Sequence, residues 1–279
     1  MSRFAIAAML AMVAFASNSI LCRMALRGTS IDPATFTCVR LVTGALTLWF
    51  LIRITRGGMG RAGDWGSAAA LLAYAAAFSF AYVGLTAGTG ALLLFGAVQV
   101  VMIAAGLTAG ERVRSSTVFG WGLAVAGVAW LVAPGVAAPP AREALLMMGA
   151  GVAWGVYSLR GRRSTDALRD TAGNFVRAAP GALLLSALLW THRSWDPLGG
   201  LLAAASGSIA SGLGYAAWYT ALPRLSAIAA GNAQLSVPVL AAFGGVVMFG
   251  ESITLRLTVA SLMVLGGIAV ALNRPRNTP

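Results

Sequence analysis

Long apolar runs constrain this chain more than any other feature. About ten runs of roughly 20 residues follow one another, and a membrane-spanning helix needs about that length. They cover residues 4–24, 33–52, 66–85, 88–107, 117–136, 144–160, 172–190, 198–221, 226–249 and 255–273. Runs such as 68–77 and 259–272 are apolar at both odd and even positions, unlike the alternating strands of a membrane β-barrel. We therefore predict an all-α membrane protein with ten transmembrane helices.

Composition excludes the main soluble alternatives. The sequence is 58% hydrophobic and 10% charged, with a mean hydropathy of +0.81, which a water-soluble domain could not carry without large exposed apolar areas. The net charge of +12 comes entirely from arginines scattered in short turns, with no basic face for nucleic acid. The predicted surroundings are a lipid bilayer, and nucleic acid is not an expected partner.

Arginine placement predicts the orientation. With the N-terminus inside, the alternate loops that face the cytoplasm carry 13 arginines and the outer loops carry 5. The sequence therefore predicts a multi-pass protein of the bacterial inner (plasma) membrane with both termini in the cytoplasm. Residues 3–16 also resemble a signal peptide, but the internal repeat pairs this segment with a later helix, so we retain it as the first span.

A second copy of the sequence follows the first after about 137 to 140 residues. Residues 38–46 align with 175–183 and share Val-Arg and Gly-Ala-Leu at the same spacing, and residues 81–111 align with 221–251 without a gap. An odd number of spans in each copy forces the second copy to enter the membrane from the opposite side. We therefore predict two inverted five-helix repeats, residues 1–139 and 140–279, with a site near the midplane between them.

The second half contains residues 214–219, Gly-Tyr-Ala-Ala-Trp-Tyr, followed by 221–227, 235–241 and the Gly-Glu pair at 250–251. This pattern resembles the drug/metabolite transporter superfamily, specifically its tandem-repeat EamA-type exporters. The run at 215–218 is similar to the aromatic amino-acid exporters of the YddG type. The resemblance implies ten spans, cytoplasmic termini and export of amino acids, aromatic or otherwise neutral, and of related small metabolites.

Polar amides far from the loops are the first candidates for a site. Amides are costly in lipid unless they face a cavity or a partner helix. An amino acid has an ammonium and a carboxylate that amides can bind, and the alternative is hydrogen bonding between helices. The candidates are Asn18, Gln99, Asn232 and Gln234.

Aromatic residues form two stripes. Positions 74, 78 and 82 repeat every four residues, which places them on one helix face, and positions 215, 218 and 219 follow the same spacing. Facing inward, such stripes would form an amphipathic wall for apolar or aromatic cargo; the alternatives are interfacial belts and packing. The candidates are Tyr74, Phe78, Tyr82, Trp154, Tyr157, Tyr215, Trp218 and Tyr219.

Arg40 and Arg177 are the charged residues within the predicted spans. Each lies a turn or two from a helix end, where arginine can extend to the interface, so two interpretations stay open: a structural anchor or carbonyl contact, and a contact with a substrate carboxylate.

Small residues and a proline are candidate hinges, since they allow close approach or kink a helix. These are Gly88, Gly90, Pro238 and Gly244.

Absences limit the mechanism. No carboxylate lies within a predicted span, so there is no evident proton relay, and we predict facilitated export or exchange. The single histidine, His192, lies at a helix end. The string Ile209-Ala210-Ser211-Gly212 does not match the nucleophile of an intramembrane serine protease. We therefore predict no enzyme, no metal and no cofactor.

The alternatives to amino-acid export are transport of other cargo, such as a nucleotide sugar or a quaternary ammonium drug, and a non-transporting scaffold. The sequence leaves open the oligomeric state, with a monomer as one alternative, and whether Cys22 and Cys38 pair.

Overall fold

The structure is a computed structural model that describes residues 3–58, 60, 62–110, 115–135 and 137–272. Within these residues every regular element is a helix, so the all-α prediction is confirmed. The α-helices are α1 (Arg3–Gly28), α2 (Pro33–Arg56), α3 (Trp65–Tyr82), α4 (Ala87–Thr108), α5 (Ser115–Val132), α6 (Ala141–Gly161), α7 (Ala167–Leu188), α8 (Pro197–Ala205), α9 (Gly214–Ala221), α10 (Ala227–Ala233), α11 (Ser236–Phe249) and α12 (Leu255–Leu272). Two short 3₁₀-helices, η1 (Trp190–His192) and η3 (Leu222–Arg224), and a π-helix, η2 (Ser206–Leu213), complete the fold.

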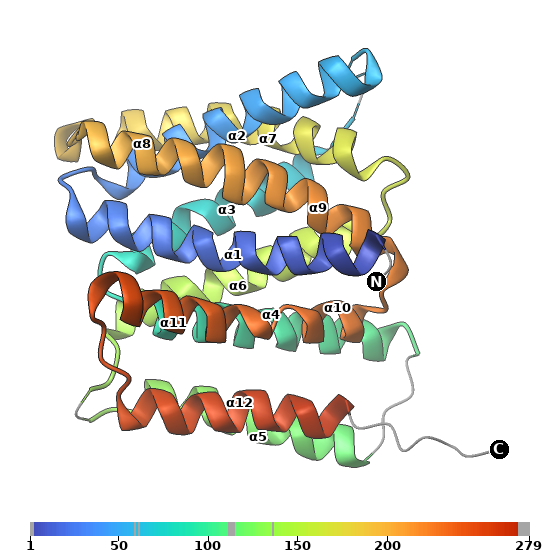
Figure 1. The fold of residues 1–279 in the computed structure, drawn as a ribbon, viewed down its shortest axis with the longest axis vertical. Helices are drawn as coiled ribbons and strands as arrows, with labels where there is room; N and C mark the ends of the chain where they lie inside the picture. The colour runs from blue at the N-terminus through green and yellow to red at the C-terminus, as the bar shows by residue number, and fades with distance from the viewer. Residues whose placement is uncertain (1–2, 59, 61, 111–114, 136, 273–279) are drawn as a thin grey trace.

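The helices form a bundle of roughly parallel and antiparallel rods (Figure 1). The start of α1 and the end of α12 lie at the same end of this bundle, which we call the terminal end; the other is the distal end. Within the part of the chain that the structure describes, six segments are long and apolar enough to cross a membrane, judged by length and composition. They are Phe4–Gly28, Pro33–Arg56, Trp65–Tyr82, Ala87–Thr108, Ser115–Val132 and Ala229–Phe249. A multi-pass membrane protein is thus supported, and the count of ten spans stays a prediction.

The predicted span 198–221 is interrupted in a way that the sequence did not reveal. Elements α8, η2 and α9 follow one another without a gap from Pro197 to Ala221, and the middle eight residues are π-helical. This middle segment is rich in Gly and Ser and packs against α2. A methyl group on Gly207 would lie 2.2 Å from the carbonyl oxygen of Arg40, so only glycine permits this approach.

The expected kink at Pro238 takes a different form. Helix α10 ends at Ala233 and α11 begins at Ser236, so Pro238 lies in the first turn of a new helix and not midway along a continuous one. The backbone N–H groups of a first turn have no intrahelical partner, so proline costs no hydrogen bond there. The expectation that Pro238 kinks a continuous helix was therefore wrong, and its role as a hinge stays a prediction. Helix α4 carries Val98 in place of a proline and runs unbroken.

Aspartates at the edges of the apolar runs start several helices. The side chains of Asp32, Asp64, Asp166 and Asp196 precede α2, α3, α7 and α8, and each accepts a hydrogen bond from a backbone N–H of the first turn. Such caps satisfy donors that would otherwise lack a partner and are each worth about 1 kcal/mol. These four aspartates therefore have a structural role in the fold.

At the distal end, Glu251 holds three segments together. Its carboxylate accepts a hydrogen bond from Arg23 Nε at 3.0 Å and from the backbone N–H of Ala87 at 2.9 Å. Arg23 also donates to the carbonyl oxygen of Tyr82 at 3.2 Å. This Glu251 junction ties α1, the α3–α4 turn and the segment after α11.

At the terminal end, Asp64 holds a second junction. Its carboxylate accepts from Arg160 Nη2 and from Ser67 Oγ, each at 2.6 Å. The backbone N–H of Asp64 donates to Asn174 Oδ1 at 2.9 Å. This Asp64 junction connects the start of α3 with α6 and α7.

Candidate functional site

A buried guanidinium lies at the centre of the polar contacts inside the bundle. Arg40, on α2, donates from Nε to Ser211 Oγ at 3.0 Å and from Nη2 to the hydroxyls of Tyr74 at 3.0 Å and Tyr215 at 3.1 Å. The Tyr74 hydroxyl also accepts from Asn18 Nδ2 at 3.2 Å. We call Arg40, Asn18, Tyr74, Ser211 and Tyr215 the Arg40 cluster; it draws on α1, α2, α3, η2 and α9.

Arg40 does not extend to an interface, because only 1% of its surface is exposed. Its Cζ lies 5.1 Å from the ring centroid of Tyr74 and 5.0 Å from that of Phe78, within cation–π range. Its Nη1 is buried and has no hydrogen-bond partner among the described residues. An arginine with only neutral partners in a low-dielectric interior costs several kcal/mol. Arg40 therefore places a positive charge in the interior that is paired with no acidic side chain of the described residues.

An aromatic cluster adjoins the Arg40 cluster, with Trp154 of α6 at its centre. The Trp154 ring lies 5.3 Å from Phe15, 5.1 Å from Tyr74, 5.6 Å from Tyr157 and 4.7 Å from Tyr215, centroid to centroid. The geometries are edge-to-face or tilted, which aromatic pairs favour. Four helices thus contribute to one continuous apolar wall.

The amides divide into three hydrogen-bonded sets. Trp154 Nε1 donates to Gln234 Oε1 at 2.7 Å, which links the aromatic cluster to the end of α10. Gln99 Nε2 donates to Asn232 Oδ1 at 2.8 Å and so joins α4 to α10, while Gln99 Oε1 is buried without a described partner. Asn18 accepts a hydrogen bond from Ser206 Oγ and belongs to the Arg40 cluster.

The structure thus brings most of the predicted site residues together. Tyr157 packs against Tyr219 at 5.6 Å, and Trp218 packs against Phe15 at 5.9 Å. Tyr82 lies 4.7 Å from Phe78 and donates its hydroxyl to the carbonyl oxygen of Ala87, next to the Glu251 junction.

Arg177 lies apart from these clusters. Its Nη1 donates to the carbonyl oxygen of Gly173, at 3.0 Å, and to that of Ala62. It holds the chain before α3 against α7, which is the contact expected of a structural anchor. The two arginines occupy aligned positions in the two halves of the sequence and have different partners.

The glycines predicted as hinges lie where helices approach closely. A methyl group on Gly88 would lie 2.8 Å from Ala242 Cβ, one on Gly90 would lie 2.5 Å from the Tyr82 ring, and one on Gly244 would lie 2.2 Å from Ile20. Such contacts explain the absence of side chains at these positions. A hinge role for them stays a prediction.

Sequence reasoning missed several contributors. Phe15 contacts three rings of the cluster, and Ser206 and Ser211 supply hydroxyls from the π-helix. Phe175 packs on Tyr215 at 5.6 Å. The serine- and glycine-rich run at 206–212 was a detectable signal, whereas nothing local distinguishes Phe15 from a lipid-facing residue.

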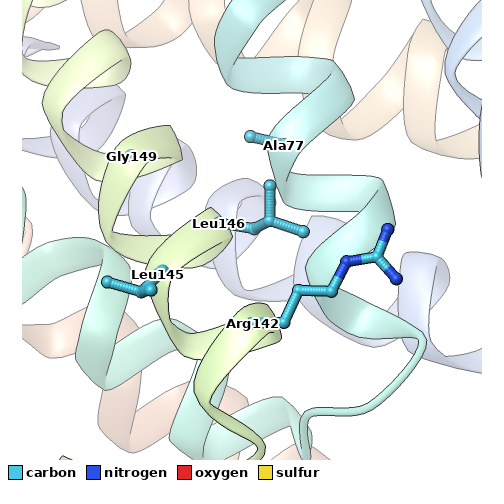
Figure 2. Close-up of a pocket in the computed structure, with 5 residues that line it drawn as sticks. All are labelled: Ala77, Arg142, Leu145, Leu146 and Gly149. Carbon is cyan, nitrogen blue, oxygen red and sulfur yellow. The ribbon is translucent and has the colours of Figure 1, made fainter.

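A separate groove of about 560 Å³ lies on the flank of the bundle, between α3 and α6 (Figure 2). Ala77, Leu145, Leu146 and Gly149 give it an apolar lining, and Arg142 lies at one end. None of the predicted site residues lines this groove, so it is distinct from the buried clusters.

Comparison with known proteins places these observations in context. Residues 141–273 match the model of the EamA-like transporter family. An uncharacterised protein of Pseudomonas aeruginosa, PA1977, is 53% identical over 264 residues, which cover 94% of this chain and 92% of that protein. The threonine/homoserine exporter RhtA of Escherichia coli is 33% identical over 133 residues, 45% of this chain and 42% of RhtA. A crystal structure with 20% identity covers 95% of both chains with a TM-score of 0.70, which supports the fold.

Proposed function

This chain belongs to the EamA-like transporter family of the drug/metabolite transporter superfamily, whose members are transporters and not enzymes, and on that premise we propose that it exports neutral amino acids, aromatic ones among them, and related small metabolites. The observation that carries this proposal is the buried Arg40 cluster beside an aromatic wall. A cation, hydroxyls, amides and rings in one place suit a small zwitterion with an uncharged side chain. The likeness to an exporter of threonine and homoserine supports the same class of cargo.

We propose further that residues 1–139 and 140–279 are inverted repeats, each contributing five of ten spans. In such a repeat each span of the first half corresponds to the span five places later, so α1 corresponds to α6, α3 to the rod α8–η2–α9, and α4 to α10–α11. Exchanging the two halves turns the contact of α3 with α6 into a contact of α9 with α1. It likewise turns the contact of α4 with α6 into a contact of α11 with α1, and all four contacts occur. This pairing supports the repeat.

Alternating access follows from such a repeat, since two related halves have two related packings that expose one site to opposite sides. We propose that the protein lies in the bacterial inner membrane with both termini in the cytoplasm. The bias of 13 arginines against 5 supports this orientation. Of these arginines, Arg61, Arg112, Arg114, Arg274 and Arg276 lie outside the described residues.

The test is counterflow in proteoliposomes. Vesicles loaded with one unlabelled amino acid, from a panel of neutral, aromatic, acidic and basic ones, are diluted into the labelled form. We expect transient uptake for neutral amino acids. If other metabolites exchange and no amino acid does, the proposed cargo is wrong.

Coupling is tested in the same vesicles with an imposed pH gradient. No acidic side chain lies in the Arg40 cluster or the aromatic cluster, so we expect exchange to continue without the gradient. A strict requirement for the gradient would contradict facilitated export or exchange.

A further inference from the structure

One nitrogen of the Arg40 guanidinium lacks a hydrogen-bond partner among the described residues. A guanidinium has five N–H donors in a planar fork. In Arg40, Nε and Nη2 donate to Ser211, Tyr74 and Tyr215, and Nη1 has no described partner although it is buried. The edge formed by Nη1 and Nη2 is one of the two edges through which a guanidinium binds a carboxylate with two parallel hydrogen bonds.

The charge of Arg40 is also uncompensated. The ion pairs between the described residues join Arg23 to Glu251, Arg56 and Arg169 to Asp166, and Arg160 to Asp64, and none of them includes Arg40. All three acceptors that Arg40 has are hydroxyls, and a hydroxyl is a weaker acceptor for a cation than a carboxylate is. A carboxylate that reached this point would gain both the charge and the unused donor.

Arg177 provides an internal comparison. It lies at the aligned position of the second half, yet it is partly exposed and donates to two backbone carbonyls. Backbone carbonyls are fixed acceptors that belong to the fold, so Arg177 is already satisfied. The hydroxyls of Tyr74 and Tyr215, by contrast, belong to side chains, so their hydrogen bonds to Arg40 can be exchanged without a change in the backbone of a helix.

We propose that Arg40 is the carboxylate-binding residue of the cargo site, that Arg177 is not, and that cargo without a carboxylate is bound poorly. This inference rests on the transport function proposed above and narrows it from neutral metabolites in general to those with one carboxylate. In the described conformation, both tyrosine hydroxyls accept from Nη2, and the carboxylate would bind Nη1 and replace them at Nη2 when the bundle opens.

Ligand pairs that differ only in the carboxylate test the proposal without relying on transport. The full chain in nanodiscs is titrated with L-phenylalanine and L-phenylalaninamide, with L-threonine and L-threoninamide, and with propionate and propionamide at matched ionic strength. Binding is followed by tryptophan fluorescence and thermal shift. For the wild type we expect each carboxylate to bind at least about tenfold more tightly than its amide.

Variants assign the effect to Arg40. Arg40→Gln should weaken carboxylate binding at least about tenfold while leaving amide binding within about twofold, so that the preference disappears. Arg40→Lys should recover part of it, because the charge returns without the fork, and it also serves if Arg40→Gln does not fold. Arg177→Gln should keep the wild-type ratio of carboxylate to amide binding even if it lowers thermal stability.

Several outcomes would overturn the assignment. These are equal binding of acids and amides by the wild type, a preference that persists in Arg40→Gln, and a preference that disappears in Arg177→Gln. The proposed transport of amino acids fails separately, through an absence of counterflow, while propionate and propionamide still report on Arg40.

Discussion

At the scale of single residues, the buried site is organised by a few side chains with two kinds of contact. Trp154 contributes a ring to the aromatic cluster and a hydrogen bond from Nε1 to Gln234. Trp218 is equally buried and also packs on Phe15, but its Nε1 has no described partner. The pair therefore separates the contribution of the hydrogen bond from that of the ring.

Trp154→Phe and Trp218→Phe are expected to differ in stability. Both lose similar ring area, and only Trp154→Phe leaves Gln234 Oε1 buried without a donor, which costs about 1–3 kcal/mol. Thermal and denaturant unfolding in detergent should show Trp154→Phe as the less stable variant by about that amount. Equal loss in the two variants would show that the hydrogen bond contributes nothing net.

At the scale of elements, the helix starts are set by aspartates that double as contacts between helices. Asp64 caps α3 and also accepts from Arg160 of α6. Partial burial raises the pKa of Asp64, but hydrogen bonds from the side chain and backbone of Ser67 and from Arg160 outweigh it and hold the pKa at about 2. The cap therefore stays charged far into the acid range.

Asp64→Asn tests this cap through its pH dependence. Because the folded-state pKa is depressed, the stabilisation is complete above the unfolded value of about 3.9 and is lost as pH falls through about 2. The difference in melting temperature between wild type and variant should be constant from about pH 7 to pH 5 and should shrink below about pH 4. In Arg160→Gln the folded-state pKa of Asp64 lies closer to the unfolded value, so the loss should be smaller and should be complete at a higher pH. A difference that varies between pH 5 and 7 would point to another group.

At the scale of the whole molecule, both ends of the bundle are fastened at once. The Glu251 junction ties the distal end and the Asp64 junction ties the terminal end, while Arg40 between them is buried. Alternating access requires that one end open while the other stays closed. In the described conformation both junctions are formed while Arg40 is buried, which is the arrangement that the proposed alternating access expects of a state closed on both sides.

Glu251→Gln should loosen the distal end. Cys22 is fully buried on α1, next to Arg23, and in a Cys38→Ser background it is the only thiol of the chain. We expect maleimide labelling of Cys22 to accelerate about tenfold, as for a lost contact of about 1.4 kcal/mol. Arg56→Gln, which removes the exposed pair with Asp166, should leave the rate unchanged. Equal labelling of both variants would show that the Glu251 junction does not close the distal end.

Much of the fold could be predicted because lipid imposes a simple rule on sequence. Apolar length placed the helices within a few residues, as for 88–107 against Ala87–Thr108. The π-helix and the break before α11 could not be predicted from the sequence, because they depend on how η2 packs against α2 and on where α10 ends. The four-residue spacing of Tyr74 and Phe78 predicted that they share one helix face, and their rings are in contact. The different partners of Arg40 and Arg177 could not be predicted, because they come from segments distant in sequence.

The π-helix also sets the angular phase of everything that follows it. One extra residue in a turn rotates the rest of a helix by about 100° relative to an uninterrupted α-helix. Tyr215 faces Phe15 and Trp154, and Trp218 faces Phe15, with that offset already included. Moving the extra residue along the rod would turn individual side chains toward or away from Arg40 without shifting either end of the helix, so contacts with Arg40 and the positions of the loops can change independently.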